Sequence, residues 1–170
     1  PFRLTAEQER ALDEIAAERQ RQLTRMGNAA WAAGLALLML GRDEGNVWLL
    51  RAADRYRESW QGAPAGSWGR PIGAMKARLI AGDSDGALED ARWALAAGAT
   101  ESESPIGRYA ASLAHLVLGE DAEAEELAAT LLRRDDFPTD RDRFTTLDWI
   151  GADREQGDFD PVIDHHLGLS

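Results

Sequence analysis

"PIGAMKARLIAGD", residues 71–83, and "PIGRYAASLAHLVLGED", residues 105–121, are the two stretches that decide the fold this sequence predicts. Both open with Pro-Ile-Gly, continue as an apolar, alanine-rich segment, and end in a glycine followed by an acidic residue. Proline is favoured at the first position of a helix, and glycine can close a helix by adopting the left-handed conformation. Each stretch therefore predicts the first helix of a helical hairpin, and their recurrence predicts a repeat.

The same glycine-closed turn occurs four times along the chain. The four glycines are Gly41, Gly82, Gly119 and Gly157. An Asp or Glu near each glycine can accept hydrogen bonds from the free amides at the start of the next helix. The sequence predicts one domain over residues 1–170 with hairpins at about residues 28–59, 67–97, 104–134 and 140–170.

The residues around these turns resemble those of tetratricopeptide repeats. The matched positions are Gly82, Asp83, Ala87 and Ala94 in the second unit and Gly119, Ala124 and Leu131 in the third. The resemblance covers roughly residues 28–170. It implies an all-α, right-handed α-solenoid of about four hairpins. It also implies that the first helices of successive hairpins line a concave, ligand-binding groove.

Residues 5–26 predict a separate N-terminal helix that covers the exposed end of the first hairpin. Thr5 and Gln8 form a capping-box pattern at its start. The apolar stripe of this helix consists of Leu12, Ile15, Ala16, Leu23 and Met26. At the other end, the last helix packs inward, pairs two subunits, or leads into further chain; a monomer and a homodimer through this helix both remain open.

Composition limits the classes of function. The net charge is −11 and no basic run occurs, which disfavours binding to nucleic acid. The longest apolar stretch, residues 29–41, is shorter than the ~20 residues that span a bilayer, and the N-terminus lacks the pattern of a signal peptide. The chain has no cysteine. We expect a soluble, cytoplasmic protein with no membrane contact.

Catalytic and metal-binding signals are weak. The three histidines are His115, His165 and His166. His115 lies in an apolar helix, and adjacent helical residues such as His165 and His166 point about 100° apart, so they do not share one ion comfortably. No nucleophile elbow, phosphate loop or metalloprotease motif occurs. We expect neither an enzyme nor a cofactor; the alternative is a small metal protein or enzyme that uses Asp160, Asp164 and His165.

The candidate binding residues are cations and nearby aromatic or imidazole side chains on or just before the first helices of the second and third hairpins. They are Trp68, Arg70, Lys76, Arg78, Arg108, Tyr109 and His115. Cations beside an aromatic side chain suit a peptide carboxylate. The competing interpretation is that these cations pair with neighbouring carboxylates of the chain itself.

The sequence thus predicts a protein-interaction or scaffold module that binds a peptide or partner protein, possibly an acidic one, in the concave groove. A second hypothesis is that the acidic chain acts as an inhibitor or immunity-type protein for a basic partner.

Overall fold

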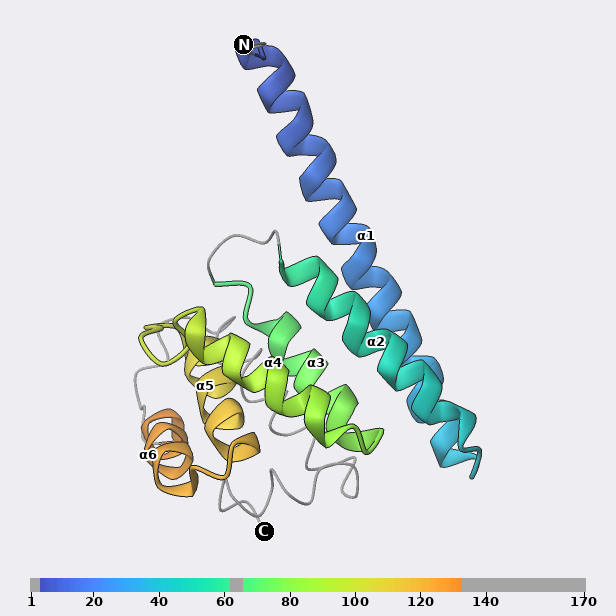
Figure 1. Cartoon of the computed structure of the whole chain (residues 1–170), viewed down its shortest axis with the longest axis vertical. Helices are drawn as coiled ribbons and strands as arrows, with labels where there is room; N and C mark the ends of the chain where they lie inside the picture. The colour runs from blue at the N-terminus through green and yellow to red at the C-terminus, as the bar shows by residue number, and fades with distance from the viewer. Residues whose placement is uncertain (1–3, 62–65, 133–170) are drawn as a thin grey trace.

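The computed structural model describes residues 4–61 and 66–132, and this part of the chain is entirely α-helical (Figure 1). The helices are α1 (Ala6–Met39), α2 (Glu44–Trp60), α3 (Gly69–Ile80), α4 (Ser84–Ala96), α5 (Pro105–Val117) and α6 (Asp121–Leu132). The all-α prediction is confirmed. The predicted fourth hairpin, with Gly157, Asp160, Asp164 and His165, lies outside the described residues.

Three short turns join α1 to α2, α3 to α4, and α5 to α6, and each contains a glycine in the left-handed region. The φ angles are 70° at Gly41 and 77° at both Gly82 and Gly119. At the second turn, the amide of Asp83 donates to the carbonyl of Arg78 at 2.8 Å. The other two turns repeat this bond, which satisfies a carbonyl that the end of the helix leaves free. The predicted glycine-closed turns are confirmed for these three hairpins.

The first residues of α4 and α5 are capped by side chains that are typical of helix starts. The Ser104 hydroxyl accepts a hydrogen bond from the Gly107 amide at 3.1 Å, and Pro105 occupies the first position of α5. The Asp83 carboxylate caps α4 in the same way, accepting from the Gly86 amide at 3.1 Å. These caps fix where each helix begins, and so fix the length of the turn before it.

Each helix packs against the next one along the chain, and α3 also packs against α5. Small side chains dominate the contacts. Ala87, Ala91 and Ala94 of α4 are completely buried, as the stripe of small residues in the sequence predicts. The two most enclosed helices are α3 and α5, whose residues are buried on nearly every side. The core therefore runs through the first helices of the second and third hairpins.

The predicted boundary between an N-terminal helix and the first hairpin does not exist, because α1 runs unbroken over 34 residues. Gly27, which falls between the predicted helix at 5–26 and the predicted hairpin at 28–59, lies inside α1 against the ring of Tyr56 from α2. A Cβ atom at Gly27 would lie 2.8 Å from Tyr56 Cε1. Farther along, Gly34 similarly meets Leu49 and the backbone of Gly45. Glycine serves here to bring two helices close together, not to end one.

The first half of α1 extends beyond the end of α2 and away from the other helices (Figure 1). Leu12 and Ile15 are 52% and 65% exposed, whereas Leu23 is buried. The prediction that residues 5–26 cover the first hairpin with their apolar stripe is therefore wrong for these outer residues. The α2 helix is only 17 residues long, half the length of α1, so it cannot reach them.

Candidate functional site

A charge network centred on the buried side chains of Arg78 and Asp90 lies at the junction of α2, α3 and α4. Arg78 of α3 donates from Nε to Asp90 Oδ2 of α4 at 2.8 Å. Its Nη1 donates to Asp83 Oδ2 at 2.6 Å, and its Nη2 donates to Asp54 Oδ1 of α2 at 2.9 Å. One guanidinium group thus joins two hairpins and the turn between α3 and α4.

Burial and pairing act against each other in this network. Asp90 is 1% exposed, and its burial raises the pKa of its carboxyl group despite the opposing effect of the Arg78 hydrogen bond. Burial alone would lower the pKa of Arg78, but the hydrogen bonds to Asp83 and Asp90 outweigh it and raise this pKa. Arg78 therefore carries its charge inside the fold.

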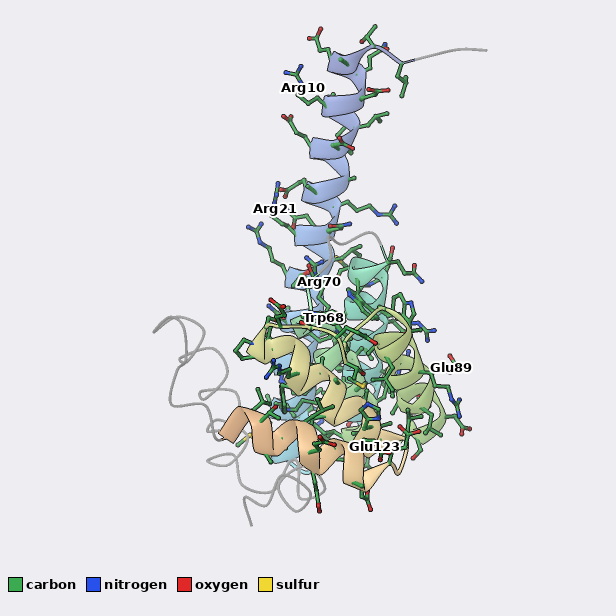
Figure 2. The ribbon with its side chains drawn as sticks, turned by 90° about the vertical axis from the view of Figure 1, so that its left-hand side faces the viewer. Arg10, Arg21, Trp68, Arg70, Glu89 and Glu123 are labelled. Carbon is green, nitrogen blue, oxygen red and sulfur yellow. The ribbon has the colours of Figure 1, made fainter. Side chains whose placement is uncertain are left out.

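Next to this network, α2 and α4 border an open groove of about 590 Å³. Its lining residues come from the end of α2 and the outer side of α4, where Figure 2 shows Glu89 at the surface. They are Arg57, Gln61, Glu89, Arg92 and Trp93. Both helices are the second members of their hairpins.

Arg57 is the central cation of this groove. Its guanidinium carbon lies 5.4 Å from the ring centre of Trp93, and its Nη1 lies 3.1 Å from Glu89 Oε2. The same nitrogen lies 3.4 Å from Asp90 Oδ1, an oxygen that accepts no hydrogen bond. This contact joins the groove to the buried Arg78 network through electrostatic attraction alone.

Trp93, which lines the groove, packs against an aromatic cluster that contains Trp60 and Trp68. Trp60 of α2 meets Trp93 edge to face, with 4.0 Å between ring centres. Trp60 also meets Trp68, whose ring centre is 6.1 Å away. Trp60 and Trp68 are buried at 9% and 6% exposure, so both form core, and Trp68 is not the exposed groove residue that the sequence predicts. Their packing fixes the position of Trp93.

The structure does not bring the sequence-predicted binding residues together on an open surface. Four of the seven are buried in the described fold: Trp68, Lys76, Arg78 and Tyr109. None of the seven lines the α2–α4 groove. The physical reason is that α3 and α5, on which the predicted groove depended, form the interior of the described fold.

The three remaining residues are partly exposed and make contacts within the chain. Arg70 donates to Thr24 Oγ1 at 3.2 Å and to the Ser59 carbonyl at 3.3 Å, and its burial lowers its pKa. Arg108 makes a weak contact, 3.4 Å from Nε to the Ser102 carbonyl. His115 Nδ1 lies 2.6 Å from Glu120 Oε2. The competing interpretation, that cations pair within the chain, thus holds for Arg78, while Arg70 pairs with neutral oxygens.

The binding residues predicted from the sequence do not include Arg57, Arg92 or Trp93. The adjacent letters Arg92-Trp93 carry a signal, since they place a cation and an aromatic side chain on one helix. The contact between Arg57 and Trp93, however, joins α2 to α4, and no pattern of neighbouring residues in the sequence predicts it.

Within residues 4–61 and 66–132, no group of three or more metal-ligating side chains gathers at one place. None of the helices in these segments combines the length and the apolar character needed to span a membrane.

Comparisons with protein-family models, with curated proteins and with solved structures found no match to this chain.

Proposed function

We propose that this chain is a helical-repeat module that binds a segment of another protein and catalyses no reaction. We also propose that its hairpins belong to a right-handed α-solenoid of the tetratricopeptide-like kind. Support comes from the recurring glycine-closed turns and from the contact between α3 and α5, the first helices of two successive hairpins. Such next-but-one contacts are expected when hairpins stack in one direction.

The observation that carries the proposal is the α2–α4 groove, where two arginines flank one tryptophan. Arg92 forms no hydrogen bond or ion pair within the described part of the chain, so its guanidinium group can receive a ligand. The groove thus offers cations and an aromatic wall in a chain of net charge −11. Surface recognition by Arg and Trp is a common source of binding energy.

The chemistry of the groove favours an acidic peptide segment with an apolar side chain. A guanidinium group can hold a carboxylate through two parallel hydrogen bonds. A ligand carboxylate can displace Glu89, whose side chain is 64% exposed, from Arg57. The neighbouring apolar side chain would then lie against Trp93, which the aromatic cluster already holds in place.

Selection from a displayed random-peptide library on the full chain tests this proposal. We expect a consensus that contains Asp or Glu next to an apolar residue. For a selected peptide, Arg92→Glu and Trp93→Ala should each weaken binding at least about tenfold, the effect of losing one charged or aromatic anchor. Arg51→Glu, on the exposed side of α2, is the matched control and should bind normally. Equal losses in all three variants, or no selected peptide, would contradict the proposal.

A second function is favoured by the surface of α6 and the turn before it. The exposed acidic residues there are Glu120, Asp121, Glu123, Glu125 and Glu126. Glu123 is visible at this surface in Figure 2, and residues 109–132 contain no Lys or Arg. Such a surface suits an inhibitor of a basic protein. A strongly basic consensus, lost on Glu123→Lys with Glu126→Lys but not on Arg92→Glu, would replace the first proposal with this one.

A further inference from the structure

The outer half of α1 makes almost no contact with the other helices in the part of the chain that the structure describes (Figure 1). Residues 4–22 are exposed except for the half-buried Ala17 and Gln20. Arg10 and Arg21 lie on this projecting segment in Figure 2. Among the described residues, its one ion pair with another helix joins Arg19 to Glu58 of α2, with 2.9 Å between Nη2 and Oε1. Exposed pairs of this kind add little stability.

An apolar row follows one face of α1 and is interrupted by Arg19 and Gln22. Its members are Leu12, Ile15, Met26, Ala29, Ala33, Ala36 and Leu40, the residue that caps the end of the helix. This apolar row is a different face from the one that packs on α2, which contains Leu23, Gly27, Ala30 and Gly34. All of its members are exposed except the half-buried Ala33, and Met26 is 52% exposed. The row therefore has the spacing of a second helix contact that the described residues leave open.

The charges of α1 are divided between two neighbouring segments. Residues 6–16 contain four acidic side chains and one basic one, namely Glu7, Glu9, Asp13, Glu14 and Arg10. Residues 17–27 contain three basic side chains and one acidic one, namely Arg19, Arg21, Arg25 and Glu18. Two such helices placed antiparallel bring the acidic segment of each against the basic segment of the other. A parallel pair would bring like charges together.

We propose that two copies of this chain dimerise through the apolar rows of their α1 helices, arranged antiparallel. A twofold axis makes the contact self-complementary, because each copy supplies both the acidic and the basic segment. The projecting half of α1 then lies along the projecting half of the partner's α1, with residues 6–16 of each copy against residues 17–27 of the other. This contact covers the exposed apolar side chains Leu12, Ile15 and Met26 of the projecting half. The contact is separate from the α2–α4 groove and does not depend on the proposed function.

Sedimentation equilibrium of the full chain tests the dimer. We expect a mass of twice 18.6 kDa. Ile15→Glu should raise the dimer dissociation constant by about a hundredfold or more, because it places an unpaired charge in the apolar contact. The matched control is Ala6→Glu, which adds the same charge nine residues away, on the opposite side of the helix. A monomeric wild-type chain, or equal dissociation by both variants, would overturn the proposal; helix content by circular dichroism checks that both variants fold.

Charge exchange tests the antiparallel orientation. A variant with Glu9→Arg and Asp13→Arg, and a second with Arg21→Glu and Arg25→Glu, should each dimerise more weakly than the wild type. In an antiparallel homodimer of either variant, segments of like charge face each other and repel. Mixing the two should restore a heterodimer, which native mass spectrometry distinguishes by mass. Unchanged association of each variant alone, or no recovery on mixing, would contradict the antiparallel contact.

Discussion

Arg78 Nε of α3 donates a 2.8 Å hydrogen bond to Asp90 Oδ2 of α4, and both side chains are buried. The same arginine reaches Asp54 of α2, so one guanidinium group bonds to both of the first two hairpins. The charge of Arg78 stabilises the fold only while its buried partner Asp90 remains, because these two groups have lost most of their water.

Arg78→Met should therefore be strongly destabilising. It leaves Asp90 with only the 3.4 Å contact to Arg57, and we expect a loss of about 3–5 kcal/mol in the free energy of unfolding. Arg55→Met removes the exposed pair with Glu58 and should cost less than about 1 kcal/mol. Urea denaturation followed by circular dichroism measures both. Similar losses in the free energy of unfolding for the two variants would show that the Arg78 network does not stabilise the fold more than an exposed ion pair does.

The close approach of α1 and α2 gives a second prediction. Gly27→Ala improves helix propensity by about 1 kcal/mol, but its Cβ would meet the ring of Tyr56 at 2.8 Å. The ring also lies against Gly73 of α3, where an added Cβ would be 2.9 Å away, so it has little room to move. We expect a net loss of about 1–3 kcal/mol, the usual cost of overpacking. Thermal denaturation measures it, and a stabilised Gly27→Ala variant would refute the close contact.

The hairpin turns give a third prediction. At Gly82, with φ at 77° and open space around the position, Gly82→Ala introduces backbone strain without a steric clash. The expected loss is about 1 kcal/mol in the free energy of unfolding. Gly82→Asn should lose less, because asparagine tolerates the left-handed conformation better. If alanine and asparagine behave alike, the turn does not hold that conformation.

Tyr56 gives a prediction about alkaline pH. Burial raises the pKa of Tyr56 to about 12 from a usual value of 10.0, and its hydroxyl donates to Asn28 Oδ1 at 2.8 Å. A raised pKa of an acidic group contributes stability that is complete below the unfolded pKa and is lost as the pH rises toward the folded pKa. The free energy of unfolding should thus fall between about pH 10 and 12.

Tyr56→Phe should remove that part of the pH dependence. At pH 9 it should cost only about 1 kcal/mol, for the lost hydrogen bond. Urea denaturation at pH 9 and pH 11 compares the two proteins, and Tyr109 is common to both. An equally steep decline in the variant would assign the alkaline instability to other groups.

The parts of the fold that the sequence predicts correctly are those fixed by local chemistry. The left-handed conformation at Gly82 and the cap formed by Ser104 depend on residues within a few positions of each other. Gly27 shows the limit of this reasoning. Its role is set by Tyr56 of another helix, so the helix boundary predicted at this position falls inside α1.

The candidate site was harder to predict for the same reason. Arg78 looks like a surface cation because it stands on the first helix of a hairpin, yet its partner Asp54 is 24 positions away. The groove residue Arg57 likewise meets Glu89 from 32 positions away. Contacts at such separations depend on how the hairpins pack, and the repeat pattern alone does not specify that packing.

The most direct test of the proposed function is the nuclear magnetic resonance spectrum of the six tryptophan indole N–H groups, measured as a selected acidic peptide is added. Trp93→Phe and Trp68→Phe assign the two signals that matter. The account predicts that the Trp93 signal shifts most and saturates with the peptide, while the signal of the buried Trp68 shifts less. A saturating shift confined to other tryptophans, with Trp93 unchanged, would contradict binding in the α2–α4 groove.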